Sequence, residues 1–168
     1  MIVNPLKIKR WIIDELEASM VLYFIGASRS SAAIIDQQKK NTSSGNEKAI
    51  EAMHKIKQSA IDMKQALLKG DMKEFSRILG EGWENKKKMA DNITNSMIQE
   101  VFDLAISAGA VAGKVSGAGG GGFVMLMVEP TRKKELINAL KKLNGFVMPF
   151  HFTEGGAHGW KIYSTNKV

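Results

Sequence analysis

The sequence predicts an α+β fold, a two-layer sandwich in which a mixed or antiparallel sheet carries helices on one face. Three observations predict it: apolar segments typical of strands near both ends of the chain, amphipathic helical stripes between them, and two short strands joined by glycines. The expected order is strand, helices, strand, strand, helix, strand, strand, which suits a ferredoxin-like core. With 168 residues, 44% of them hydrophobic, and no internal repeat or linker, residues 1–168 fit one domain.

The first strand is predicted within residues 16–25, which are mostly apolar and contain β-branched and aromatic side chains. Gly26 ends this segment, and the serines and arginine of residues 28–31 indicate the start of a helix. A polar cluster at residues 41–46 then predicts an exposed loop.

A helical hairpin should follow. Its first helix ends at Gly70, and Ser44 with Glu47 forms the expected capping box. Its second helix begins at Asp71, which repeats the capping signal with Glu74. The apolar stripe of the first helix consists of Ile50, Met53, Ile56, Ala60, Ile61, Leu67 and Leu68, and that of the second of Met72, Phe75, Leu79 and Trp83. This spacing predicts two antiparallel helices with a very short connection.

A third helix is predicted over residues 96–108, with Ser96 and Gln99 at its cap. Short strands at residues 110–115 and 123–128 come next, on either side of a glycine-rich loop. Because so short a loop joins them, these two strands should form an antiparallel hairpin.

The last part of the chain predicts one more helix and two more strands. Residues 129–131 open the helix, whose apolar face consists of Leu136, Ile137, Leu140 and Leu143. An alternating strand follows, with Phe146, Met148, Phe150 and Phe152, and we interpret its three phenylalanines as core. A turn at residues 155–156 and a strand around residues 160–163 complete the expected fold.

Composition excludes several classes of protein. The chain has no cysteine, which excludes disulfides and cysteine-based metal sites and fits a reducing cytoplasm. No apolar run approaches the roughly 20 residues of a membrane span, and the N-terminus lacks a signal-peptide pattern. His54, His151 and His158 lack metal-ligand spacing, so we expect no metal site built by this chain. The net charge of +7 favours anionic partners: phosphorylated metabolites, nucleotides or nucleic acid.

The glycine loop is the strongest signal for function. Six of the eleven residues from 113 to 123 are glycine, and Lys114 stands just before the loop. Glycine permits positive φ and leaves no Cβ between the backbone N–H groups and a ligand. Successive N–H groups in such a turn can converge on an anion. A phosphate is the natural candidate, although a hairpin rich in glycine for close packing fits the same residues.

Two better-known phosphate motifs do not fit this loop. Gly117, Gly119 and Gly122 match G-x-G-x-x-G, but a helix precedes this loop and a strand follows it, the reverse of the dinucleotide fingerprint. Residues 109–115 have one residue too few between their glycines for a Walker A loop, and no Ser or Thr follows the lysine. If the loop binds a phosphate, its own backbone must therefore do so, because no helix N-terminus follows it.

Residues 114–123, Lys-Val-Ser-Gly-Ala-Gly-Gly-Gly-Gly-Phe, resemble the third conserved motif of the GHMP kinases, and more narrowly that of the D-glycero-D-manno-heptose 7-phosphate kinase group. The resemblance spans almost the whole chain, although Ile25 replaces a usual threonine. The other similar segments are residues 4–6 (Asn-Pro-Leu), 16–19 (Leu-Glu-Ala-Ser), 26–29 with Ser31, Trp83 with Lys86 and Lys87, and 93–95 (Ile-Thr-Asn).

The resemblance implies a GHMP kinase C-terminal domain whose N-terminal ATP-binding domain is absent. In the intact enzyme, ATP with Mg²⁺ would phosphorylate a hydroxyl, expected at C1, of a heptose 7-phosphate or similar sugar phosphate, and this chain alone should be inactive. The resemblance places Gly117, Ala118, Gly119, Gly120 and Gly121 beside the nucleotide phosphates. It offers Ser28, Arg29 and Lys87 as ligands for the sugar or its phosphate. It assigns no catalytic residue.

Two further functions fit the residues. One is a stand-alone α+β binding module that senses a phosphorylated metabolite through the loop. The other is a basic nucleic-acid-binding domain, a role that ferredoxin-like sheets also serve. No aromatic-basic segment typical of RNA recognition accompanies the sheet, which makes the nucleic-acid function the weaker of the two.

Overall fold

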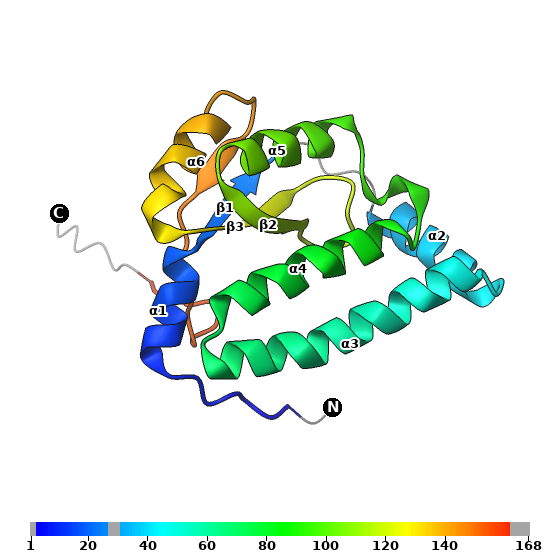
Figure 1. Ribbon diagram of the computed structural model, residues 1–168, viewed down its shortest axis with the longest axis horizontal. Helices are drawn as coiled ribbons and strands as arrows, with labels where there is room; N and C mark the ends of the chain where they lie inside the picture. The colour runs from blue at the N-terminus through cyan, green and yellow to red at the C-terminus, as the bar shows by residue number, and fades with distance from the viewer. Residues whose placement is uncertain (1–2, 27–30, 162–168) are drawn as a thin grey trace, which may run out of the picture.

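The computed structural model describes residues 3–26 and 31–161, and its elements follow the predicted order with one additional helix and, within these residues, without the last predicted strand (Figure 1). The helices are α1 (Arg10–Ala18), α2 (Ser31–Ser43), α3 (Glu47–Lys69), α4 (Met72–Lys87), α5 (Ser96–Ser107) and α6 (Lys133–Leu140). The strands are β1 (Met20–Phe24), β2 (Ala110–Val115), β3 (Phe123–Val128) and β4 (Phe146–Met148). Short 3-10 turns lie at Asp91–Ile93 and Pro130–Arg132.

The sheet is antiparallel with strand order β2-β3-β1-β4, which is the order of a ferredoxin-like core. β3 pairs with both β1 and β2, and β4 pairs with the outer side of β1. Helices α2 to α5 connect β1 to β2, and α6 connects β3 to β4. The predicted α+β class, the glycine-closed hairpin and the ferredoxin-like order are therefore confirmed.

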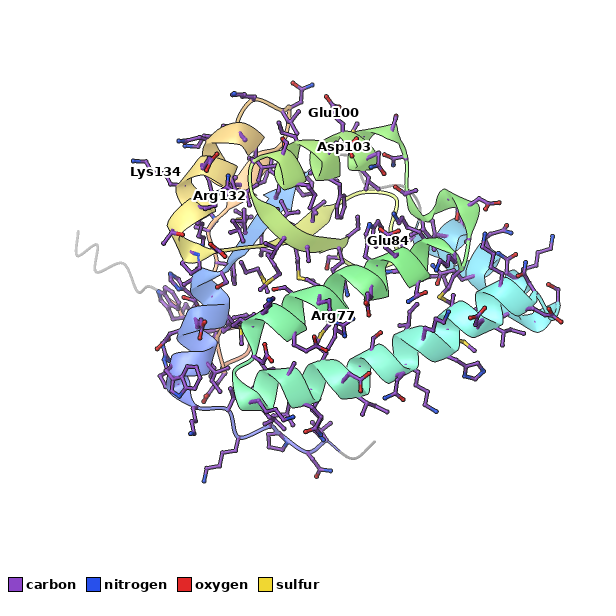
Figure 2. All side chains as sticks on the ribbon, in the orientation of Figure 1. Arg77, Glu84, Glu100, Asp103, Arg132 and Lys134 are labelled. Carbon is purple, nitrogen blue, oxygen red and sulfur yellow. The ribbon has the colours of Figure 1, made fainter. Side chains whose placement is uncertain are left out.

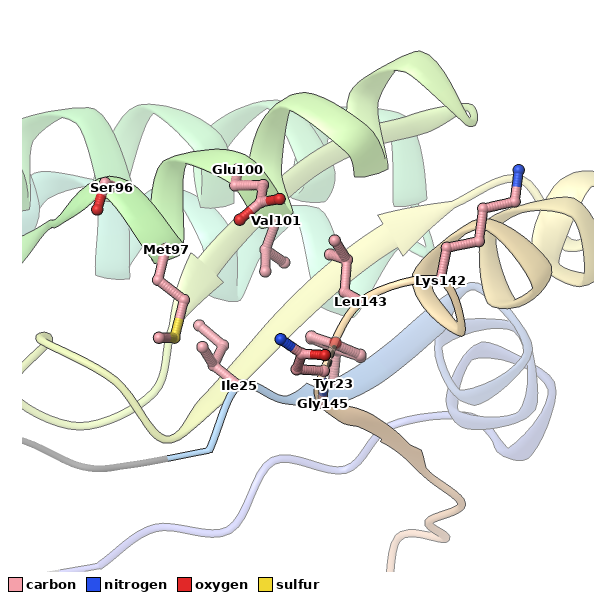
Figure 3. Close-up of a pocket in the computed structure, with 10 residues that line it drawn as sticks. Tyr23, Ile25, Ser96, Met97, Glu100, Val101, Lys142, Leu143 and Gly145 are labelled. Atoms are coloured by element: carbon pink, nitrogen blue, oxygen red, sulfur yellow. Dashed lines mark hydrogen bonds between the residues drawn. The ribbon is translucent and has the colours of Figure 1, made fainter.

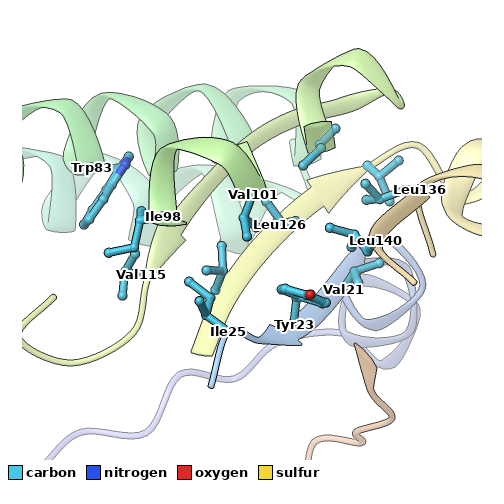
Figure 4. Packing of buried hydrophobic residues seen from close by; sticks show 14 of the residues in the cluster. Val21, Tyr23, Ile25, Trp83, Ile98, Val101, Val115, Leu126, Leu136 and Leu140 are labelled. Atoms are coloured by element: carbon cyan, nitrogen blue, oxygen red, sulfur yellow. The ribbon is translucent and has the colours of Figure 1, made fainter. Parts of the chain in front are cut away.

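The main core lies between one face of the sheet, called here the first face, and helices α5 and α6 (Figure 4). Alternate residues of the central strands point into it, as the period of two in a strand requires. The strands contribute Val21, Tyr23, Val124, Leu126 and Val128, and the helices contribute Ile98, Val101, Ala105, Leu136 and Leu140. Leu126, Leu136 and Leu140 are fully buried. This core fixes the positions of α5 and of the strand ends beside the glycine loop.

The opposite or second face is covered where β1 begins. There Met20 and Met127 pack with Leu16 of α1 and with the helical hairpin α3–α4. The hairpin contributes Ala66 from α3 and, from α4, Phe75, Ile78 and Leu79. The hairpin thus packs α4 against β2 and part of the second face, so that helices cover part of this face as well as the first.

Several element boundaries differ from the sequence prediction. Residues 16–18 belong to α1, because Leu16 and Ile12 are spaced four apart and share the buried side of that helix. The strand begins at Met20. Gly70 ends α3 in the left-handed conformation, with φ 73°, and Asp71 caps α4, both as predicted. The other two predicted caps are wrong: α3 is capped by Asn46 and α5 by Asn95, whose side chains accept from backbone amides.

The final segment departs most from the prediction. After β4 ends at Met148, residues 149–161 form no regular strand, so the expected strand at residues 160–163 is absent over its described part. Phe146 and Phe152 are 50% and 48% exposed, so the interpretation of these two side chains as core is wrong. Phe150 does pack against the second-face core. In the described ranges, no helix is both long and apolar enough to cross a membrane.

The cap of α4 gives a direct test of this architecture. The Asp71 carboxylate accepts from the Glu74 amide at 2.9 Å. Asp71→Ala should lower the free energy of unfolding by about 1 kcal/mol, because that amide loses its partner. The matched control is Asp62→Ala, which removes an exposed carboxylate of α3 bonded to the Gln58 side chain and should cost less than about 0.5 kcal/mol. Urea denaturation measures both, and equal losses would contradict the assigned cap.

Candidate functional site

The glycine loop, residues 116–122, connects β2 to β3 at one edge of the sheet. Gly117, Gly119, Gly120, Gly121 and Gly122 all have positive φ, from 73° to 151°. Residues other than glycine rarely adopt these backbone angles, which explains why the loop is rich in glycine. The Ser116 amide donates to the Phe123 carbonyl at 2.7 Å and closes the hairpin below the loop.

The loop is held in place by residues 93–95, just before α5. The Gly120 amide donates to the Ile93 carbonyl at 2.8 Å, and the Asn95 side-chain amide donates to the Gly120 carbonyl at 3.2 Å. A Cβ on Gly119 would lie 2.7 Å from the Ile93 carbonyl oxygen. The close packing of Ile93 against this position is therefore sufficient to explain why residue 119 is glycine. Of the five predicted phosphate-binding residues, Gly120 already uses its amide within the described chain.

Two lysines supply positive charge to the loop. Lys86, in the last turn of α4, donates from Nζ to the Gly117 carbonyl. Burial lowers the pKa of Lys86, and the nearby positive charge of Lys114 lowers it further. Among the described residues, neither lysine forms an ion pair. Two neighbouring cations without a carboxylate partner favour an anionic ligand.

Lys87, which the resemblance offers as a ligand, has a partner on its own helix. Its Nζ lies 2.6 Å from the carboxylate of Glu84, whose position on α4 is labelled in Figure 2. Lys86, rather than Lys87, is the α4 lysine bonded to the loop. The sequence could not choose between them, because residues three and four positions after buried Trp83 both lie on its side of the helix.

Ser28 and Arg29 lie outside the described residues, but the described chain that precedes them ends beside the loop. β1 and β2 are each antiparallel to β3, so β1 ends at the same edge of the sheet at which β2 enters the loop. The Ile25 amide donates to the Gly122 carbonyl at 2.9 Å. The described chain just before the predicted sugar ligands thus meets the glycine loop at one edge of the sheet.

A pocket of about 390 Å³ lies on the first face near this edge (Figure 3). Tyr23 and Ile25 form its floor, and Glu100 from α5 and Lys142 from beyond α6 line it. The Tyr23 hydroxyl accepts from the Gly145 amide at 2.7 Å. This bond connects β1 to the residue just before β4 at the border of the pocket. The carboxylate of Glu100 repels phosphate, so the glycine loop with its two lysines is the better anion site.

The bond from Lys86 can be tested through the mobility of the loop. In Lys86→Gln the shorter, neutral side chain does not reach Gly117, and the loss of about 1 kcal/mol should speed hydrogen exchange at residues 117–122 about fivefold. Lys88→Gln is the control, because Lys88 is exposed and bonds to Asn85 of its own helix. Equal protection of the loop in both variants would show that Lys86 does not hold it.

Comparison with known proteins gives consistent matches. The family model of the GHMP kinases C terminal matches residues 63–144. The chain is 47% identical over 161 residues to the D-glycero-alpha-D-manno-heptose 7-phosphate kinase of Campylobacter jejuni, covering 96% of this chain and 47% of that one. It is 25% identical over 126 residues to the L-fucokinase/L-fucose-1-P guanylyltransferase of Bacteroides fragilis, covering 71% of this chain and 13% of the relative.

Solved structures agree with these matches. A D-glycero-D-manno-heptose 1-phosphate kinase from Bacteroides thetaiotaomicron superposes with a TM-score of 0.67 at 59% identity, covering 97% of this chain and 42% of that chain. The mevalonate kinase of L. major shares the fold, with a TM-score of 0.67 at 16% identity, over 73% of this chain and 37% of its own. The chain thus spans less than half the length of these relatives. It belongs to the GHMP kinase family and carries that family's C-terminal domain.

Proposed function

We propose that this chain is the C-terminal part of an ATP-dependent sugar kinase. The enzyme would transfer the γ-phosphoryl group of ATP to a hydroxyl, at C1, of a heptose 7-phosphate or a similar sugar phosphate. The observation that carries the proposal is the positive-φ glycine loop with Lys86 and Lys114 beside it, two lysines that form no ion pair with any described residue. The names of the Campylobacter jejuni and Bacteroides thetaiotaomicron relatives support the sugar class.

The loop would assist phosphoryl transfer by holding positive charge in a fixed position beside the phosphates. Phosphoryl transfer spreads negative charge over the phosphoryl oxygens, and enzymes accelerate it by positioning and by neutralising that charge. The amides of Gly117, Ala118, Gly119 and Gly121 would face the nucleotide phosphates. Gly120 instead holds the loop against Ile93. The partly buried Lys86 and Lys114 would add two positive charges at the loop.

The sugar phosphate would bind at the same edge. Arg29 is proposed to hold its phosphate bidentately, with Ser28 contacting a hydroxyl, because β1, which precedes them in the chain, ends beside the loop. Lys87 would contribute only after leaving Glu84, its ion-pair partner. This arrangement would bring the phosphate donor and the sugar close together, as transfer between them requires.

The remaining machinery would come from an N-terminal ATP-binding half. No cluster of three or more His, Asp or Glu side chains suited to a metal occurs in residues 3–26 and 31–161. Mg²⁺ would therefore be held by the ATP phosphates and by groups of that other half. On this proposal residues 1–168 form one domain of a cytoplasmic enzyme, and the half described here has no turnover alone.

A fusion enzyme tests the activity directly. It places the rest of the Campylobacter jejuni relative, the part not matched here, in front of this chain. We expect ADP release that depends on heptose 7-phosphate, and none from the 168 residues alone, because the loop provides one wall of the site. A cooperatively folded fusion that releases no ADP with any phosphorylated heptose would refute the kinase. Sugar-phosphate binding by the chain alone, unchanged by the fusion, would instead favour the stand-alone binding module.

The role of the loop in ATP binding can be tested in the same fusion by adding a side chain to it. Gly117→Asn places a side chain in open space, since nothing lies within 4 Å of the added Cβ and asparagine tolerates positive φ. We expect kcat/KM for ATP to fall at least about tenfold, a loss of about 1.4 kcal/mol. Gly45→Asn is the matched control: its φ of 77° is close to the 73° of Gly117, its surroundings are open, and it lies between α2 and α3. Equal rates in the two variants would remove the loop from the site.

A further inference from the structure

Three phenylalanines form a continuous row across the sheet at the edge that carries the glycine loop. Phe24 of β1 pairs in register with Phe123 of β3 on one side and Phe146 of β4 on the other. Their ring centroids lie 5.0 and 5.2 Å from that of Phe24, with the planes tilted by 53° and 41°. Phe123 also accepts the bond from Ser116 that closes the loop. The row and the loop are therefore parts of one edge.

The row lies on the second face, at the end that the helices leave open. At the start of β1 this face is covered, and Met20 and Met127 are 7% and 1% exposed. Phe146 is 50% exposed, and Phe24 and Phe123 are half-buried. On the first face of the same strands, Tyr23 and Val124 are fully buried by comparison. Burial along the second face thus decreases toward the glycine loop.

We propose that this phenylalanine row is the surface on which the N-terminal half of the kinase docks. The inference rests on the proposed function, since it names the place of a partner that this function requires. An apolar strip beside an anion site matches the anatomy of an interface whose core excludes water and whose border carries charge. The partner surface should accordingly be apolar opposite the row.

The position of the row relative to the loop supports this partner. To place ATP phosphates at the loop, the N-terminal half must approach the same edge of the sheet. Lys114 pairs with Met125, two residues from Phe123, and so lies on the same face as the row. An N-terminal half seated on the row would therefore bring its bound phosphates toward Lys86 and Lys114.

The path of the chain supports it as well. Residues 3–9 run on the side of the sheet where α3 and α4 lie, away from α5 and α6 (Figures 1 and 4). The matched kinases extend well beyond the part that this chain covers, 47% of one and 42% of another. A preceding half that joins near Val3 would thus lie on the second-face side.

Other occupants fit less well. A second copy of this chain, with its net charge of +7, would bring two pairs of unpaired lysines together across a symmetric interface. Nucleic acid requires flat aromatic faces on which bases stack, whereas these rings are tilted onto one another. Photocrosslinking distinguishes the N-terminal half, a second copy and nucleic acid as occupants of the row.

Site-specific photocrosslinking in the fusion enzyme tests the docking surface. Phe146→p-benzoylphenylalanine puts the crosslinker on the row, and Ile106→p-benzoylphenylalanine puts it on α5; the two native side chains are similarly exposed, 50% and 53%. After irradiation, mass spectrometry should find crosslinks from position 146 to peptides of the N-terminal half at least about tenfold more abundant than from position 106. A crosslinker at Met148, 37% exposed on the same face, is the second probe if position 146 disturbs β4.

Each other result overturns the proposal. Crosslinks from positions 146 and 148 to a second copy or to nucleic acid would assign the row to that partner. Yields no higher than at position 106 would leave the row outside any interface. ADP release is measured on the same fusion: turnover without crosslinking refutes the docking surface alone, whereas crosslinking without turnover refutes the kinase activity and keeps the surface.

Discussion

The contact between the glycine loop and residues 93–95 is the constraint on which the candidate site depends. Asn95 makes two bonds that join separate parts of the fold: its side-chain oxygen caps α5, and its side-chain nitrogen donates to Gly120. Because α5 is itself buried against the first face, the main core fixes the position of the loop through Asn95. Donors fixed in this way need no reorganisation when charge develops, which is the condition for electrostatic stabilisation of a transferring phosphoryl group.

Positive charge at the loop follows from the same packing. α4 is placed by its contacts with β2 and the second-face core, and its last turn brings Lys86 to the Gly117 carbonyl. Lys114 is placed by its register with Met125. Burial and mutual repulsion oppose the charged form of Lys86, as its lowered pKa shows. A bound anion would offset both costs by attracting the charged lysine, which supports the proposed phosphate site.

The sequence predicted what short-range patterns determine and failed where tertiary contacts decide. Gly70 and Asp71 were placed correctly because a left-handed C-cap and a side-chain N-cap are local devices. Asn95 was missed as a cap because neighbouring Ser96 gives an equally good local signal. Helix spacing could not separate Lys86 from Lys87. The exposure of Phe146 was missed because alternation marks a face of a strand, whereas only the arrangement of the helices decides whether that face is covered.

That uneven coverage also explains how a chain spanning less than half of its relatives folds yet leaves its proposed site open. Both faces of the sheet bury apolar side chains at the end where β1 begins, and the first face does so along its whole length. Phe24, Phe123 and Phe146 belong to neither of these two buried clusters. On the second face, the apolar side chains of the central strands are less buried at the edge that holds the loop and the lysines than at the other end. A second domain there would complete a cleft and exclude water from the phosphates.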